Sequence, residues 1–132
     1  IITYLIRRPR ALLLHLKRFI VNEATVSFRK NKARVSFTKL LSLDQYRDKT
    51  DTNSANLNDS YNLRGVVCHL GSTASSGHYT ANCMRTKKLL NNDEKKAEWV
   101  SFDDGVSFHT SAQNVTESEK NQRAAYMLLY SR

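Results

Sequence analysis

Cysteine, proline and glycine are all scarce in this chain of 132 residues, which has two cysteines, one proline and four glycines. The cysteines, Cys68 and Cys83, are too few for a disulfide framework and do not have the spacing of a zinc site. The low proline and glycine content excludes collagen-like and low-complexity chains. We therefore expect a folded domain with reduced thiols, which is typical of the cytoplasm or the nucleus.

Long apolar runs are also missing. The run Ala11–Leu14 ends at His15, and no run approaches the roughly 18 residues of a membrane span. Hydrophobic residues make up 40% of the chain and charged residues 25%, which suits a globular domain. We expect no membrane partner. Because the chain begins with Ile1 and not with Met, we also expect it to be a fragment of a longer protein.

Acidic residues are rare in the first third of the chain. Residues 1–49 hold twelve Lys and Arg against three Asp and Glu, whereas residues 50–132 hold nine of each, so the net charge of +9 belongs to the first third. A basic surface attracts nucleic acid, membranes or acidic proteins. No aromatic or glycine-rich RNA motif accompanies it, so we favour a solvated surface. A nucleic-acid-binding module over residues 7–49 is a minor alternative, which steep salt dependence of binding would support.

The hydrophobic pattern predicts a mainly antiparallel sheet with little helix. A strand is expected over 11–20, followed by a hairpin of 25–28 with 34–37 around the polar segment 29–33. Such a sheet needs a cover on one face, so we expect part of the domain to lie elsewhere. Further strands are expected over 61–70, 78–85, 98–103 and 124–130, short helical segments over 40–47 and 110–122, and exposed loops over 48–60 and 86–97.

Four histidines are the first candidates for chemistry. His15 lies inside an apolar strand, where a structural role is the favoured interpretation, and His109 has no partner pattern. His69 and His78 flank the small-residue loop 71–77, which begins and ends with glycine. Glycine permits unusual backbone angles and the close approach of another chain, although a plain hairpin loop would also explain the pattern.

Strand alternation suggests a carboxylate partner for His78. If the strands on either side of the loop 86–97 pair with Met84 opposite Ala97, then His78 lies opposite Asp103 on the same face. A carboxylate on one ring nitrogen fixes the tautomer, and the other nitrogen is then free to accept a proton from a nucleophile. A surface ion pair is the alternative interpretation.

Neither cysteine has the setting of a nucleophile. Cys83 faces away from His78 on the same strand, and Cys68 lies in the middle of an apolar strand. Neither is at a helix start, where a thiolate is best stabilised. The loop serines lack the strained turn of a serine hydrolase. We expect both cysteines to be structural and the nucleophile to lie outside this chain.

Five sequence blocks, in order and with sensible gaps, resemble the C-terminal part of the ubiquitin-specific protease catalytic domain. The resemblance implies an α+β fold, the mainly antiparallel β palm subdomain of a papain-like cysteine peptidase, and it makes residues 1–132 the C-terminal part of that catalytic domain. The family's N-terminal cysteine box and its paired zinc-binding cysteines have no counterpart here, so no metal or cofactor is expected. The blocks are Leu14–Phe19, Tyr61–Gly71, Gly77–Ala81, Trp99–Asp104 and Ala125–Tyr130.

The resemblance implies catalytic roles for three residues. His78 would be the general base, Asp103 would orient it, and Asp104 would support the polar network of the site. The implied reaction is thiol-dependent hydrolysis of the isopeptide bond after the C-terminal glycine of ubiquitin. A thiolate paired with an imidazolium is a strong nucleophile at neutral pH, and the imidazolium can protonate the leaving lysine amine.

The resemblance also implies a binding region. Gly71, Gly77 and Tyr79 would line the channel for the tail of ubiquitin, in a loop that moves when ubiquitin binds, and Lys17–Phe19 would be structural. The implied partners are ubiquitin and ubiquitinated proteins, bound by a monomeric catalytic domain. A pseudoprotease that binds ubiquitin without cutting it is the alternative. The presence of both His78 and its acid argues against that alternative, and the sequence upstream would decide.

Overall fold

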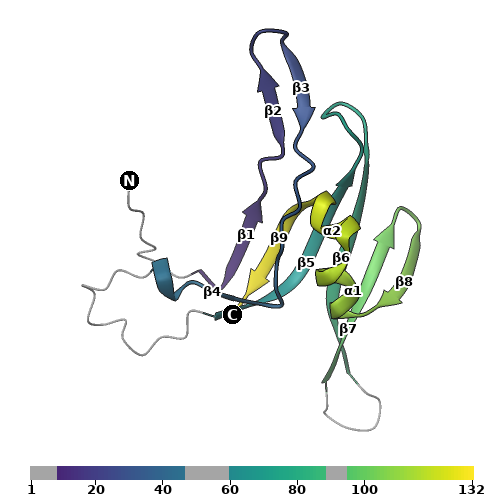
Figure 1. Ribbon diagram of the computed structural model, residues 1–132. Coiled ribbons are helices and arrows are strands. Elements are labelled where there is room, and N and C mark those ends of the chain that lie inside the picture. Colours follow the sequence, from purple (N-terminus) through teal and green to yellow (C-terminus); the bar gives the residue numbers. More distant parts are fainter. Residues whose placement is uncertain (1–8, 47–59, 89–94) are drawn as a thin grey trace.

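The computed structural model describes residues 9–46, 60–88 and 95–132, and antiparallel strands dominate it (Figure 1). The strands are β1 (Ala11–His15), β2 (Phe19–Asn22), β3 (Ser27–Lys30), β4 (Leu40–Ser42), β5 (Ser60–Leu70), β6 (His78–Lys88), β7 (Lys95–Asp103), β8 (Val106–Thr110) and β9 (Ala125–Ser131). The helices are the 3-10 turn η1 (Asp44–Tyr46) and two α-helices, α1 (Ala112–Glu117) and α2 (Glu119–Ala124). The expected sheet-rich fold with little helix is confirmed.

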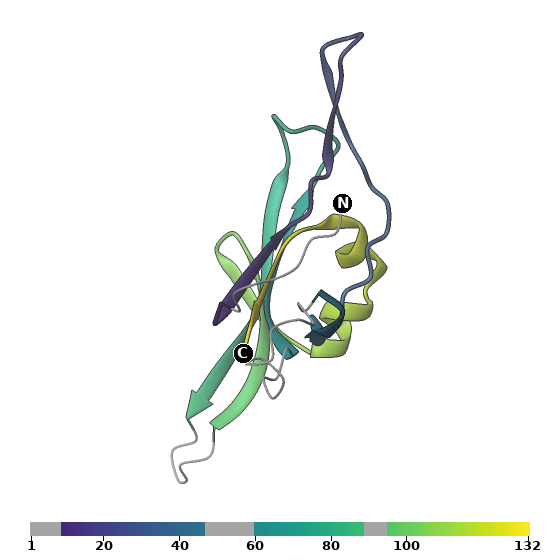
Figure 2. The same cartoon turned by 90° about the vertical axis from the view of Figure 1, so that its left-hand side faces the viewer.

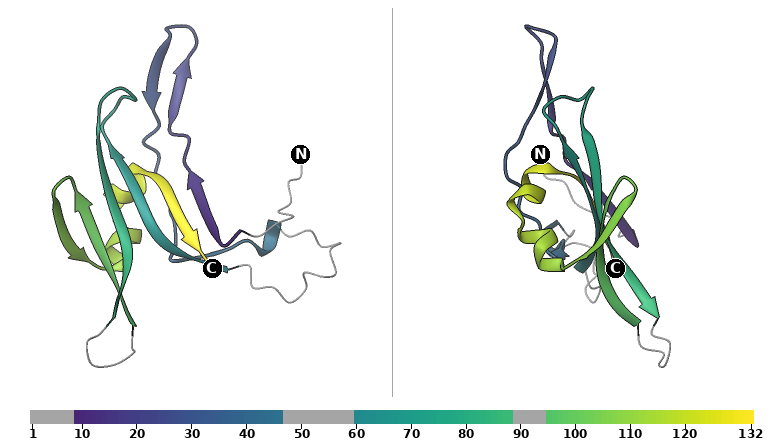
Figure 3. Two further views of the ribbon diagram at one scale, coloured as in Figure 1. Left: turned by 180° about the vertical axis from the view of Figure 1, so that it is seen from behind. Right: turned by 90° about the vertical axis from the view of Figure 1, so that its right-hand side faces the viewer.

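One sheet of seven strands organises the described residues. Its order is β1-β9-β5-β6-β7-β8, and β4 pairs with the start of β5. The last strand, β9, lies between β1 and β5, so segments from both ends of the chain are neighbours in the sheet. The helices α1 and α2 lie together on one face of it (Figures 2 and 3). No helix in the described ranges is long and apolar enough to cross a membrane.

The hydrophobic core lies between the sheet and these two helices. Val115 of α1 and Ala124 of α2 are buried there. Serine side chains start both helices, because Ser111 accepts a hydrogen bond from the Asn114 N–H and Ser118 accepts one from the Asn121 N–H. Ser118 has extended backbone angles, so the single polar helix expected over 110–122 is two short ones. The fully buried residues that the sheet contributes to this core are Tyr61, Val66, Cys68, Ala125 and Tyr130.

The strand expected over 11–20 is interrupted. β1 pairs with β9, whereas β2 leaves the main sheet and pairs with β3. The break precedes Arg18, a residue that is only 4% exposed. Its guanidinium group donates hydrogen bonds to four backbone carbonyls, and these belong to Asn31, Ala33, Gln122 and Ala125.

The predicted hairpin of 25–28 with 34–37 is wrong. The chain turns earlier, between Asn22 and Ser27, and the strands that pair are β2 and β3. The Asn22 side chain accepts a hydrogen bond from the Ala24 N–H, which stabilises this turn. Residues 34–37 form no strand, although Phe37 is buried in the core. The segment expected to be an exposed turn contains Lys30, which is buried, so the basic first third is not only a solvated surface.

The remaining expectations are largely confirmed. The strands predicted over 61–70, 78–85, 98–103 and 124–130 correspond to β5, β6, β7 and β9. The segment 40–47 holds η1 preceded by β4, and β8 was not predicted. The loop expected over 86–97 is shorter than predicted, because β6 and β7 stay paired as far as Lys88 and Lys95. Most of the loop expected over 48–60 lies outside the described residues.

Replacement of the buried guanidinium should weaken this end of the sheet. In an Arg18→Met variant of the purified protein, four backbone carbonyl groups, two of them in buried hydrogen bonds, lose their donor, at a cost of about 3 kcal/mol. Amide hydrogen exchange in β9 should then accelerate about 100-fold. Lys17→Met, which removes the same charge from the exposed neighbouring position, is the control. Equal exchange in the two variants would contradict the structural role assigned to Arg18.

Candidate active site

His78 is the first residue of β6 and directly follows the loop 71–77. β6 pairs with β7, but Asp103 lies opposite Thr80 and Met84 lies opposite Trp99. The predicted register, with His78 opposite Asp103, is therefore wrong by two residues. The prediction set Met84 opposite Ala97, but Ala97 pairs with Thr86, and the pairing continues through polar residues as far as Lys88 and Lys95.

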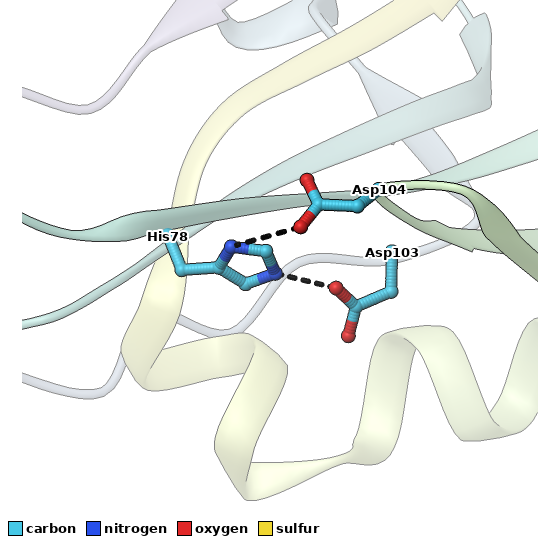
Figure 4. Close-up of side chains that lie close together, drawn as sticks. All are labelled: His78, Asp103 and Asp104. Carbon is cyan, nitrogen blue, oxygen red and sulfur yellow. Dashed lines mark hydrogen bonds and ion pairs between the residues drawn. The ribbon is translucent and has the colours of Figure 1, made fainter.

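The error of two residues leaves the faces unchanged. Side chains alternate along a strand with a period of two, so a shift of two keeps His78 and Asp103 on the same face of the sheet. They meet as diagonal neighbours, and His78 Nε2 is hydrogen-bonded to Asp103 Oδ1 (Figure 4). The predicted contact between this imidazole and this carboxylate is thus present, through a different pairing.

Asp104 lies on the other side of the ring. Its Oδ2 is 3.8 Å from His78 Nδ1, which is an ion-pair distance and too long for a hydrogen bond (Figure 4). Asp104 begins the short turn between β7 and β8 and has a φ of 49°, a conformation that Asp tolerates better than most residues. The turn therefore presents two successive carboxylates to one imidazole.

These carboxylates change the basicity of His78. The hydrogen bond to Asp103 raises the pKa of His78 above its ordinary value, and the negative charges of Asp103 and Asp104 act in the same direction. Partial desolvation and the positive charge of Lys120 in α2 oppose the shift. The side chains of His78 and Asp103 are 40% and 51% exposed, so the pair is accessible to a reacting group.

A small polar pocket of about 180 Å³ lies beside the Asp103 end of the pair. The buried residues Asn82 and Ser101 line it, and the Ser101 hydroxyl donates a 2.6 Å hydrogen bond to Asn82 Oδ1. Lys120 of α2 lines the same pocket. These three residues were not among the predicted site residues. Asn82 lies an even number of residues from His78 on β6, and Ser101 lies an even number from Asp103 on β7. This spacing places them on the same face of the sheet, and it could have predicted their position from the sequence.

The glycine-bounded loop has a backbone that requires glycine at both ends. Gly71 has a φ of 134°, which L side chains rarely adopt, and a Cβ on Gly77 would lie 2.0 Å from His69 Nε2. Tyr79 lies on the opposite face of β6 from His78; the residue is 52% exposed, and its ring packs against that of His69. The predicted role of these three residues in binding a peptide tail remains a prediction.

Both cysteines lie apart from the His78–Asp103 pair. Cys68 is buried, and this burial raises the pKa of its thiol to about 11, which disfavours a thiolate. Its Sγ contacts Asn121 Oδ1 at 3.8 Å. Cys83 has the opposite parity from His78 on β6. Among the described residues, no sulfur atom is a hydrogen-bond partner of His78.

The same three side chains also offer ligands for a metal ion. Within the described ranges, His78, Asp103 and Asp104 are the one group of this kind, with ligand atoms within 4.8 Å of one another. His78 Nε2 and Asp103 Oδ1 are, however, already hydrogen-bonded to each other. Exposed acidic groups are common without a metal, so the arrangement is explained as well by a histidine held by its acid.

Comparison with known proteins identifies the family. The family model described as ubiquitin carboxyl-terminal hydrolase matches residues 3–130, which is nearly the whole chain. The chain belongs to the ubiquitin carboxyl-terminal hydrolase family. The resemblance to ubiquitin-specific proteases is thereby confirmed.

Relatives in yeasts and in humans show the same relationship. The chain is 35% identical over 128 residues to ubiquitin carboxyl-terminal hydrolase 10 of Saccharomyces cerevisiae, covering 97% of the chain and 14% of that protein. It is 36% identical over 143 residues to human ubiquitin carboxyl-terminal hydrolase 45, covering 94% and 16%. It is 29% identical over 140 residues to a probable ubiquitin carboxyl-terminal hydrolase 3 of Schizosaccharomyces pombe, covering 98% and 25%. The chain thus spans a quarter or less of the length of these family members.

The basicity of His78 should depend mainly on Asp103. In purified protein with ¹³C-labelled histidine, an Asp103→Asn variant should show a lower NMR pKa for His78, because the hydrogen bond to a charged acceptor is lost. Asp104→Asn, which removes a charge at 3.8 Å, should lower that pKa less. A larger effect of Asp104→Asn would contradict the geometry described for this family member.

Proposed function

We propose that this chain contributes the general base and its orienting acid to a deubiquitinating cysteine peptidase. The reaction is the hydrolysis of the isopeptide bond after the C-terminal glycine of ubiquitin. The observation that carries the proposal is the His78–Asp103 hydrogen bond, in a chain that belongs to the ubiquitin carboxyl-terminal hydrolase family. Residues 1–132 form the C-terminal part of the catalytic domain, and the thiol comes from outside them.

The contact geometry supports an assignment of the two ring nitrogens. Asp103 accepts the Nε2–H, so the neutral ring carries its lone pair on Nδ1. Nδ1 is 3.8 Å from Asp104 and makes no hydrogen bond to it, so this nitrogen is available to a thiol. In this proposal Asp104 stabilises the imidazolium by its charge and leaves Nδ1 free.

The proposed reaction has two stages, formation of a thioester and its hydrolysis. The thiol proton moves to His78 Nδ1, and the thiolate attacks the carbonyl carbon of the terminal glycine. The imidazolium returns this proton to the lysine amine as the C–N bond breaks, which leaves a thioester. His78 next takes a proton from water, and the resulting hydroxide attacks the thioester carbonyl. The C–S bond then breaks, which frees the C-terminal carboxyl group of ubiquitin, and the imidazolium returns its proton to the thiolate to regenerate the thiol. Asp103 holds the ring in place throughout and remains a carboxylate.

The proposal extends to binding and to location. Gly71, Gly77 and Tyr79 contribute to the channel for the ubiquitin tail, and the partners are ubiquitin and ubiquitinated proteins. The reduced cysteines fit a protein of the cytoplasm or the nucleus. The enzyme acts as a monomer on these substrates, and neither membrane nor nucleic acid takes part.

Loss of the proposed base should abolish turnover. With a fluorogenic ubiquitin C-terminal amide as substrate, His78→Gln in the full-length protein should lower kcat by roughly 10³-fold or more, and Asp103→Asn by a smaller factor. His109→Gln, at an exposed histidine on β8, is the control and should keep wild-type activity. An active His78→Gln variant would refute the assignment.

A second measurement locates the nucleophile. Ubiquitin with a thiol-reactive C-terminal group should label the full-length protein at one cysteine, and mass spectrometry of the conjugate should place it outside residues 1–132. Labelling at Cys68 or Cys83 would contradict the proposal. Tight binding of ubiquitin with neither labelling nor hydrolysis would instead identify a pseudoprotease.

A further inference from the structure

Lys30, the last residue of β3, has a buried ammonium group with an unusual set of partners. The residue is 7% exposed, and its Nζ is hydrogen-bonded to His69 Nδ1 at 3.0 Å, to the His69 carbonyl and to the Gly71 carbonyl at 3.2 Å. Within the described residues, no carboxylate lies at ion-pair distance from it. Three acceptors match the three donors of an ammonium group; two belong to His69 near the end of β5, and one belongs to Gly71 at the start of the loop 71–77.

This contact fixes the state of His69. An ammonium group can only donate, so Nδ1 of His69 must accept, and the ring is neutral with its proton on Nε2. Burial and the positive charge of Lys30 both lower the pKa of His69, in agreement with the neutral ring. His69 is 1% exposed, and its hydrogen bond to Lys30 holds the ring in one orientation.

The neutral ring lies against both residues that flank His78. A Cβ on Gly77 would lie 2.0 Å from His69 Nε2 and 2.6 Å from its Cε1, so the ring occupies the space beside the Gly77 backbone. His69 is also the pairing partner of Tyr79 across β5 and β6, and the two ring centroids are 4.8 Å apart. The His69 imidazole therefore contacts the Gly77 backbone on one side of His78 and the Tyr79 ring on the other.

The β2–β3 hairpin is joined to the site by this contact. It extends beyond the main sheet beside the loop 71–77 (Figures 1 and 3), and Lys30 connects it to the carbonyls of His69 and Gly71. A lysine 48 residues before His78 in sequence is thus two contacts away from it.

We propose that Lys30 and His69 form a positioning pair for His78: Lys30 orients the His69 ring, and that ring holds the Gly77–Tyr79 backbone so that His78 meets Asp103. Neither residue touches the reacting atoms. The inference rests on the proposed function only in that His78 is the base; the placement of His78 against Asp103 is measurable without turnover.

The principal test replaces Lys30 by a residue of similar shape. In the full-length protein, Lys30→Met should lower kcat for a fluorogenic ubiquitin amide about 10- to 100-fold, with KM changed less than about twofold, because a misplaced base affects the chemical step. The NMR pKa of His78 should also fall, since its hydrogen bond to Asp103 loosens. Lys32→Met, two positions along on an exposed residue, loses the same charge and should change neither quantity.

A second variant separates positioning from folding. His69→Asn keeps an acceptor near the position of Nδ1 for Lys30 but removes the ring edge that lies against Gly77. It should reproduce the lower kcat and the lower His78 pKa even where Lys30→Met fails to fold.

The outcomes distinguish the two proposals. A wild-type kcat and His78 pKa in His69→Asn, or equal effects of Lys30→Met and Lys32→Met, would overturn the positioning pair and leave the proposed function intact. If the wild-type protein has no hydrolase activity, the proposed function fails. A selective fall of the His78 pKa in the variants would still support the pair in that case.

Discussion

The candidate site depends on one contact, between the His78 imidazole and the Asp103 carboxylate. This contact forms only if both side chains emerge on the same face of the sheet. β6 and β7 each contribute one member, and the two residues meet because both side chains emerge on the same face of the sheet. A slip of one residue in the pairing would send them to opposite faces, whereas a slip of two only changes a direct neighbour into a diagonal one. The extended pairing of β6 with β7, which continues to Lys88 and Lys95, fixes that register.

Two buried cations hold the surroundings of this contact without any described carboxylate. Arg18 and Lys30 are both bound by backbone carbonyls that lie near the ends of strands and helices or in the segments that follow them. Burial lowers the pKa of each. A carbonyl is a weaker partner than a carboxylate but has a fixed direction, so each cation sets the relative position of segments far apart in sequence. Arg18 fixes the start of β9, and Lys30 fixes the loop before β6.

The sequence predicted what depends on alternation and on local pattern. The strands β5, β6, β7 and β9 have clear apolar patterns, and the shared face of His78 and Asp103 followed from counting positions. β8 was missed although its two apolar residues, Val106 and Phe108, alternate with polar ones, because the strand is only five residues long. The hairpin was misplaced because its two strands were chosen for the similar alternation of residues 25–28 and 34–37, whereas the strands that pair are β2 and β3. Lys30 was read as part of a solvated charge run, since its acceptors lie about 40 residues away and no local pattern reveals them.

The two histidines on either side of the glycine-bounded loop show how surroundings divide one residue type into two roles. The hydrogen bond that His78 donates to Asp103 raises the pKa of His78, while burial and Lys30 lower the pKa of His69. If the carboxylate and the ammonium group changed places, neither histidine could keep its role. An ammonium group beside His78 would disfavour the imidazolium that the proposed reaction requires, and a carboxylate beside His69 would favour a buried charge where the structure needs a neutral ring against glycine. The negative charge of Asp103 beside His78 and the positive charge of Lys30 beside His69 therefore meet two linked requirements. A second proton must be able to reside on the His78 ring, and Nδ1 of His69 must stay unprotonated.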